Sequence, residues 1–185
     1  MTDRRLITLL FCLLGLALQA GEPAVGEPGN KGYPIPSRTE KLMFYVQRTH
    51  NRNTVVYELN LKADGTIDRK EPLHASWIRF EEGGVRKELT YVQNRVYGLD
   101  FRTIDPDTWL IKFRQYKKRE IYLVHSGKSN TYRALIRING KMAEMTGLFI
   151  CSVTNALGIP SSVKYIDILG IDPATGESLH ERVIP

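Results

Sequence analysis

The feature that most constrains this chain is a two-residue alternation of side chains that recurs from Leu42 almost to the C-terminus. Leu42, Phe44 and Val46 share one face of an extended segment, because successive side chains of a strand point to opposite sides. Similar runs follow one another and are separated by hairpin-type turn signals, of which Asn139-Gly140 is the strongest. The pattern predicts a mainly β domain, an antiparallel sandwich or barrel of about eight or nine strands with one short helix.

The alternation places the individual strands. We expect them over residues 42–47, 55–61, 73–81, 108–115, 120–125, 132–138, 141–145, 148–153 and 163–171, with a last one at 178–184. One segment departs from period two: Val85, Leu89, Val92 and Val96 recur at three- and four-residue intervals, as on one face of a helix. This spacing predicts a helix over residues 86–94.

The N-terminus has the pattern of a secretory signal peptide. Arg4 and Arg5 precede an apolar run from Leu6 to Leu18, and small residues around Ala20 offer a cleavage site. The run is shorter than the roughly 20 residues that a membrane-spanning helix needs. We therefore expect cleavage after Ala20, export to the periplasm or the medium, and no transmembrane segment in the mature chain. Residues 21–37, rich in Gly and Pro, are expected to form an extended tether before a single domain over residues 38–185.

Composition excludes several classes of protein. The 185 residues are 42% hydrophobic and 25% charged, which is ordinary for a globular domain and argues against disorder, collagen and a coiled coil. The formal charge of +6 is compatible with acidic partners, but an exported chain does not meet DNA, so no nucleic-acid partner is expected. Loss of residues 1–20 would leave Cys151 as the one cysteine. Because it shares a strand face with Phe149 and Val153, it is expected to be a buried small hydrophobe.

The segment richest in polar residues lies between the first two predicted strands, over residues 47–54. A solvated hairpin loop is one interpretation. The other follows from strand parity, which places Arg48 and then His50 on the face of Phe44 and Val46, with Asn53 beside them at the rim of the core.

A second polar group, His74, Arg79 and Glu81, surrounds Trp77, which is expected in the core. The six polar residues are therefore the candidate ligand-binding residues. A charge at the core rim must be paired or hydrated. Arg48 is expected either to pair with Glu81, the favoured arrangement, or to face a pocket with His50, Asn53 and His74. No nucleophile, phosphate-loop or metal-ligand motif is found, so no catalytic residue, metal or cofactor is predicted.

Four runs resemble one family of proteins. They are LMFYVQRTHNRNTVVYELN at 42–60, PLHASWIRFEEGG at 72–84, KELTYVQNRVYGL at 87–99 and KYIDILGIDPATGE at 164–177. Together they resemble the exported bacterial family catalogued as domain of unknown function 4833. The resemblance implies an exported single-domain bacterial protein of about this size. It implies no reaction, and no catalytic residue is carried across.

Two functions from different classes remain open. The first, and favoured, is a noncatalytic envelope or secreted module, binding or structural, with an anionic or sugar-like envelope ligand as the expected partner. The alternative is a small periplasmic hydrolase or metal-dependent enzyme that uses His50 and His74. Two imidazoles within about 5 Å of each other, with a carboxylate near, could share one zinc ion, so their separation distinguishes the two.

Overall fold

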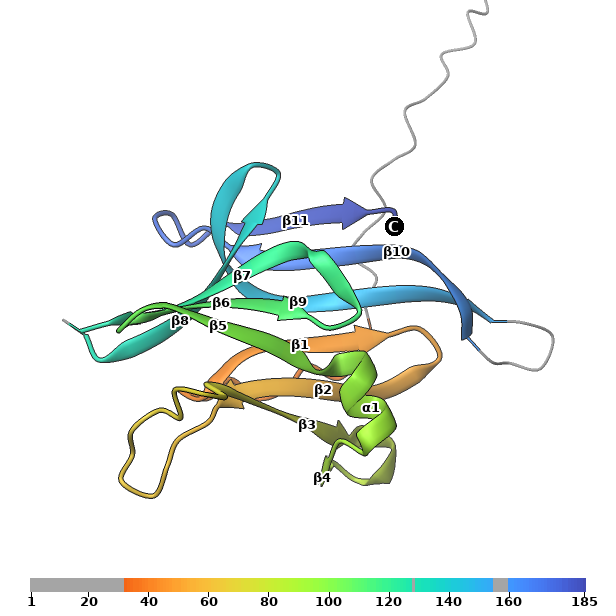
Figure 1. Cartoon of the computed structure of the whole chain (residues 1–185). Helices are drawn as coiled ribbons and strands as arrows, with labels where there is room; N and C mark the ends of the chain where they lie inside the picture. The colour runs from red at the N-terminus through yellow and green to blue at the C-terminus, as the bar shows by residue number, and fades with distance from the viewer. Residues whose placement is uncertain (1–31, 128, 155–159) are drawn as a thin grey trace, which may run out of the picture.

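The computed structural model describes residues 32–127, 129–154 and 160–185. The predicted signal peptide and most of the predicted tether lie outside them. Within the described residues the chain is mainly β, as predicted, with one α-helix (Figure 1). The strands form a single sheet that curls into a half-barrel and stays open.

The elements follow the predicted order with two additional strands. They are β1 (Leu42–Arg48), β2 (Asn51–Leu59), β3 (Leu73–Arg79), the 3-10 turn η1 (Phe80–Glu82), β4 (Val85–Glu88), α1 (Tyr91–Tyr97), β5 (Leu99–Asp105), β6 (Thr108–Phe113), β7 (Tyr116–Ser126), β8 (Thr131–Ile138), β9 (Lys141–Thr154), β10 (Pro160–Ile171) and β11 (Ser178–Val183). The two strands that the sequence did not predict are β4 and β5, and the strands predicted separately over 141–145 and 148–153 are one continuous strand, β9. Asn139 and Gly140 both have positive φ, 48° and 83°, which confirms the tight β8–β9 hairpin.

Nine strands lie side by side in the order β4-β3-β2-β1-β9-β8-β7-β6-β5, and β10 and β11 extend the sheet beyond β9. All neighbouring pairs are antiparallel except β1 and β9, which run parallel from Tyr45–Gly147 to Arg48–Ile150. Gly147 permits this approach, because a Cβ there would lie 2.9 Å from the Tyr45 ring.

Strand β9 is the point at which the sheet branches. On one side it pairs first with β8, up to Leu135–Glu144, and then with β1, from Tyr45–Gly147 onward. On its other side it pairs with β10 along most of its length. The β1–β2 and β7–β8 pairs therefore leave the same side of β9 one after the other, and the space between them is concave.

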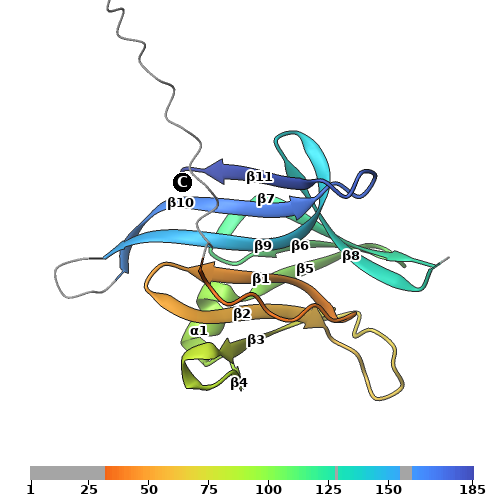
Figure 2. The ribbon, with the colours of Figure 1, turned by 180° about the vertical axis from the view of Figure 1, so that it is seen from behind.

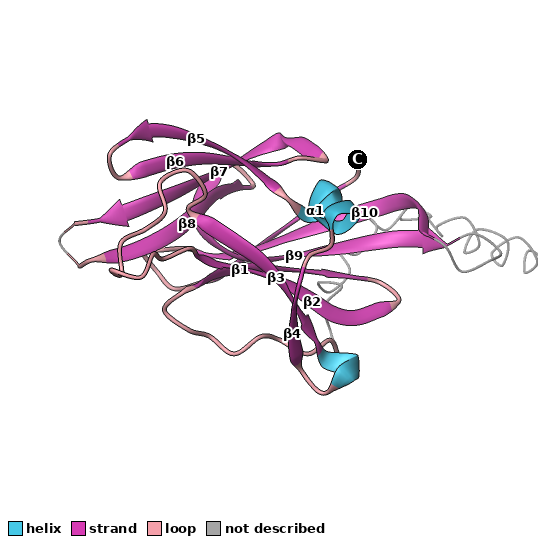
Figure 3. Ribbon diagram, turned by 60° about the horizontal axis from the view of Figure 1, so that its bottom comes forward, coloured by secondary structure: helices cyan, strands magenta, loops and turns pink. Residues whose placement is uncertain are grey.

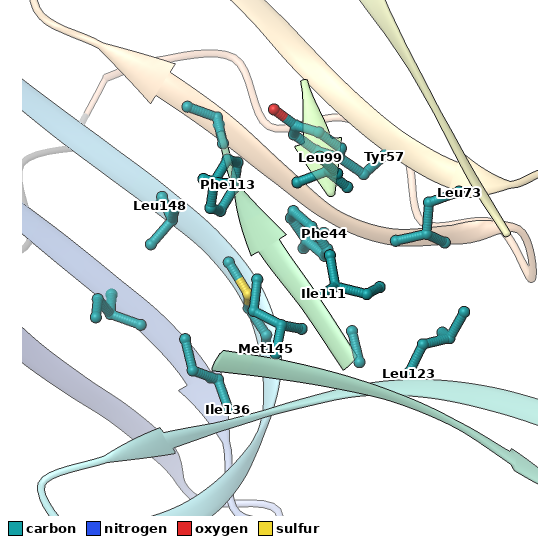
Figure 4. Packing of buried hydrophobic residues seen from close by; sticks show 14 of the residues in the cluster. Phe44, Tyr57, Leu73, Leu99, Ile111, Phe113, Leu123, Ile136, Met145 and Leu148 are labelled. Atoms are coloured by element: carbon teal, nitrogen blue, oxygen red, sulfur yellow. The ribbon is translucent and has the colours of Figure 1, made fainter. Parts of the chain in front are cut away.

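One apolar core fills the concave face of the half-barrel. The Phe44 and Tyr57 rings stack with centroids 4.5 Å apart, and the Phe113 ring meets both edge-on (Figure 4). Trp77 is 4% exposed, which confirms its predicted place in the core. Such aromatic contacts hold strands from both halves of the sheet together.

The end of the predicted tether covers part of the convex face. The Tyr33 ring packs edge-on against Phe149 at 5.2 Å, and the buried Gln47 amide donates to the Pro34 carbonyl at 2.7 Å. Figure 2 shows this segment crossing the outside of β1 and β2. Packing thus begins ahead of Arg38, the expected start of the domain. The Tyr33 ring packs on the sheet although the residues around it are rich in Gly and Pro.

The predicted helix at 86–94 is wrong in position. Residues 85–88 form β4, paired with β3, and the helix begins only after Thr90. The Thr90 hydroxyl accepts from the Gln93 amide, and the Gln93 side chain accepts from the Thr90 amide, so a capping box fixes the start. Val92 and Val96 are 69% and 48% exposed, so this helix face does not pack in the core.

Helix α1 joins the two edge strands β4 and β5 across the open side of the sheet (Figure 3). Its inward face is made by Gln93 and Tyr97. The Trp77 indole donates to the Gln93 side chain at 3.1 Å, and Tyr57 donates to the Tyr97 carbonyl at 2.7 Å. These contacts anchor the helix to β2 and β3.

Candidate functional site

A polar groove of about 1090 Å³ lies between the β1–β2 and β6–β8 parts of the sheet. Its walls come from segments that are distant in sequence: residues 38–43, 59–67, 106–109, 125 and 129–133, together with Glu144 of β9. Glu144 is also where β8 ends its pairing with β9. The groove is therefore a consequence of the branch in the sheet, and pockets of this size hold small ligands or parts of larger ones.

The acidic residues of the groove mostly have partners. Glu144 lies 3.6 Å from the Arg38 guanidinium and 3.8 Å from that of Arg133. Asp64 accepts from the Thr66 hydroxyl and amide in its own turn, and these bonds lower the pKa of its carboxyl. Glu144 is thus paired with cations, whereas Asp64 is hydrogen-bonded within its turn and keeps its negative charge near Lys62.

Three basic residues of the groove have no ion pair with any described residue: Lys41, Lys62 and Arg69. Arg69 donates from Nη1 to the Pro106 carbonyl at 2.7 Å and lies over the Trp109 ring at 5.2 Å. The Trp109 indole donates back to the Arg69 carbonyl. Arg69 is therefore held in place without losing its charge.

His125 lines the groove with both ring nitrogens engaged. Nδ1 lies 3.0 Å from an Asp107 carboxylate oxygen, and Nε2 lies 3.1 Å from Oδ1 of Asn130. The ring stacks on Tyr132 at 4.5 Å. The hydrogen bond to Asp107, and then that to Asn130, raise the pKa of His125. Two acceptors facing one imidazole favour its protonated form.

Four of the six predicted ligand-binding residues lie together at the opposite end of β1–β3. Both polar atoms of the Asn53 side-chain amide bond to Glu81: Nδ2 donates to the carboxylate and Oδ1 accepts from the Glu81 backbone amide, each at 3.1 Å. Arg79 is in register next to Asn53 and donates from Nη2 to Glu82 at 2.5 Å. Arg48 follows Phe44 and Val46 on the concave face, as parity predicts.

The favoured Arg48–Glu81 ion pair is wrong. Glu81 instead binds Asn53 and the Arg52 amide, and no acidic group of the described residues lies within ion-pair distance of Arg48. The reason is that β3 ends at Arg79, and the η1 turn carries Glu81 toward the start of β2. Burial raises the pKa of the Tyr97 phenol, and the nearby charge of Arg48 partly offsets that rise.

His50 and His74 are not brought together. His50 is exposed in the β1–β2 turn with φ of 61°, whereas His74 pairs with Glu58 near the far end of β2. Seven strand residues separate these places, which is about 23 Å at roughly 3.3 Å per residue. His74 contacts Glu88 at 2.9 Å. The two imidazoles are therefore too far apart to share one metal ion.

Sequence reasoning missed a charged cluster on β10 and β11. Asp167 is fully buried, and Arg182 donates to both of its oxygens at 2.7 and 2.9 Å. His180 Nε2 lies 2.9 Å from the same carboxylate without hydrogen-bond geometry. A carboxylate inside the apolar run 165–169 was the available signal, since a buried charge requires a partner.

Cys151 belongs to the edge of this cluster. It is half-buried, not fully buried as expected, and it pairs in register with Tyr165, over whose ring the Arg182 guanidinium lies at 3.8 Å. Burial, and then the contact with Cys151, raise the pKa of Tyr165.

The described residues contain no helix that is long and apolar enough to cross a membrane. They also contain no group of three or more His, Cys, Asp or Glu side chains placed to hold a metal ion.

Comparison with known proteins gives one match. Neither the search of curated proteins nor that of solved structures returns a significant match. A family model covers residues 44–182, from β1 into β11, and so includes the groove apart from its wall at residues 38–43, the Arg48 end of the sheet and the Asp167 cluster. The resemblance seen in the four sequence runs is thereby confirmed: the chain belongs to the family described as Domain of unknown function (DUF4833).

Proposed function

We propose that this protein is an exported, noncatalytic module that binds an extended polar ligand in the groove between β1–β2 and β6–β8. The observation that carries the proposal is the groove itself, about 1090 Å³ in volume and lined by charged, hydroxyl and amide side chains interspersed with apolar ones. Known small-molecule pockets reach about this size at their upper end, so there is room for several units of an oligomer.

The state of His125 supports binding over catalysis. A general base needs a ring nitrogen within hydrogen-bond reach of the substrate proton. Both nitrogens of His125 are occupied by Asp107 and Asn130. The imidazole therefore fixes the wall of the groove and is not free to move a proton to or from a ligand.

Export rests on the N-terminal sequence, which lies outside the described residues. Arg4, Arg5 and the apolar run to Leu18 support a cleaved signal peptide. Intact-mass measurement of the protein from its native host should give a chain that begins near Gly21, recovered outside the cytoplasm. A mass that retains Met1 in the membrane fraction would contradict export by this route.

Binding in the groove is tested by NMR on the ¹⁵N-labelled mature chain, residues 21–185. Oligosaccharides, neutral and acidic, are added, and the ligand is recovered afterwards. We expect shifts of the Gly65 and Thr131 amides and the Trp109 indole, little change at Arg48 and Asn53, and intact ligand. Shifts confined to the Arg48 end would refute the groove as the site, and a cleaved ligand would refute the noncatalytic assignment.

A further inference from the structure

We infer that the groove selects acidic oligosaccharides, that is, sugar chains carrying carboxylates, over neutral ones. This inference rests on the proposed function and specifies the class of ligand for the same groove. It follows from three properties of the described lining residues: their uncompensated charge, their neutral hydrogen-bonding groups and the protonation of His125.

The uncompensated charge of the groove is positive. Five cations line the groove, Arg38, Lys41, Lys62, Arg69 and Arg133, against four carboxylates, Glu40, Asp64, Asp107 and Glu144, so the formal charge of the described lining is positive even before His125 is protonated. Glu144 is shared between two arginines, and Asp107 is held by His125. A cleft with an excess of one charge concentrates ligands of the opposite sign.

The neutral lining fits a sugar chain better than a purely ionic polymer. Hydroxyl and amide side chains line the groove between the cations: Thr39, Thr66, Ser129, Asn130 and Thr131. The half-buried Tyr132 ring is fixed by stacking on His125. Sugar hydroxyls both donate and accept hydrogen bonds, and hydroxyl and amide groups do the same. A phosphate polymer offers hydrogen-bond acceptors alone. The accepting oxygens of the groove's hydroxyl and amide side chains would then find no donor on the ligand.

His125 adds a charge that depends on pH. The groups that face it are Asp107 from the β5–β6 turn, Asn130 from the β7–β8 turn and Tyr132 from β8. While the imidazole is protonated it neutralises Asp107. Once it loses its proton, the carboxylate charge of Asp107 stands uncompensated at the wall, and an acidic ligand is repelled.

The test compares three probes by isothermal titration calorimetry on the expected mature chain, residues 21–185: oligogalacturonate, a maltooligosaccharide of equal length and polyphosphate. Lys41→Gln/Lys62→Gln removes two of the free charges, and Lys141→Gln, on the exposed β8–β9 turn outside the groove, is the matched control. We expect oligogalacturonate alone to bind well. The double variant should bind it about tenfold more weakly, or about 1.4 kcal/mol, which is under 1 kcal/mol for each exposed lysine.

A second arm follows pH. Oligogalacturonate affinity should fall as the pH rises through the raised pKa of His125, and His125→Gln should flatten this dependence. Thermal melting of each variant checks that it is folded.

Each other outcome overturns a defined part of the reasoning. Equal binding of the neutral oligosaccharide, unaffected by the double variant, refutes acidic selectivity and leaves the proposed binding function standing. Equal binding of polyphosphate refutes the saccharide class. Absence of binding by both sugars refutes the proposed function together with this inference.

Discussion

Replacing Arg182 with methionine should destabilise the domain, whereas the same replacement at Arg48 should not. Both arginines are partly buried, and methionine keeps most of the apolar stem. They differ in their partners: Arg182 donates twice to the fully buried Asp167, whereas Arg48 has no ion pair with a described residue. The comparison therefore isolates the ionic contact from the loss of a long side chain.

The structure sets the expected magnitude. Leaving a buried charge without its partner costs about 3–5 kcal/mol. We take the lower end, about 3 kcal/mol, because the Arg182 side chain is 27% exposed and His180 stays near the carboxylate. For a domain of this size that is a fall in Tm of roughly 6–12 °C. At Arg48 the buried Nε has no hydrogen-bond partner, so its removal should leave Tm unchanged or raise it slightly.

Thermal unfolding followed by circular dichroism at neutral pH measures both variants. Asp167→Asn combined with Arg182→Met should recover part of the loss, since the stranded charge is then gone. Equal Tm values for the two single variants would refute the reasoning. A large fall for Arg48→Met would show that Arg48 has a stabilising partner after all.

Three further predictions concern the helix and the groove. Thr90→Ala should cost about 1 kcal/mol in urea unfolding, because the capping box loses its hydroxyl; an unchanged midpoint would contradict the observed helix start. Val92→Ser and Val96→Ser should each change stability by no more than about 0.5 kcal/mol, whereas Val55→Ala in the core should cost more than about 1 kcal/mol; comparable losses would place the helix face in the core. The folded pKa of His125 is raised, so its bond to Asp107 contributes fully below the unfolded value of about 6.5 and is lost as pH rises through the folded value. His125→Gln should thus lower Tm most at acidic pH, and a deficit that grows toward alkaline pH would refute the sign.

The strands could be predicted because their signal is local. Residues 132–138 and 141–153 alternate around Asn139-Gly140, and this dipeptide adopts the two positive φ values that the turn requires. The helix was misplaced because the three- and four-residue spacing from Val85 to Val96 was taken as one helix face, although residues 85–88 form β4. The capping box at Thr90 was the better signal, since it depends on hydrogen bonds within four residues.

The groove could not be predicted from any single stretch of sequence. Three of its lining residues come from different turns or strand ends: Lys41, Lys62 and His125. They line the same groove only because β1 and β8 pair with the same side of β9. Parity did place Arg48 on the concave face. It could not identify a partner, because the η1 turn after Arg79 breaks the alternation that parity relies on.

The parallel pairing of β1 with β9 governs when this protein can finish folding. Thr49 bonds to Ser152 across 103 residues, so the first strand made waits for most of the chain before its neighbour exists. Partners this remote make folding slow, in the range of milliseconds to seconds for comparable β proteins. During synthesis, β1 to β8 would emerge without the strand that unites them. The proposed export requires the chain to cross a membrane unfolded. This delay keeps the polypeptide unfolded, and so able to cross, until its last third has been made.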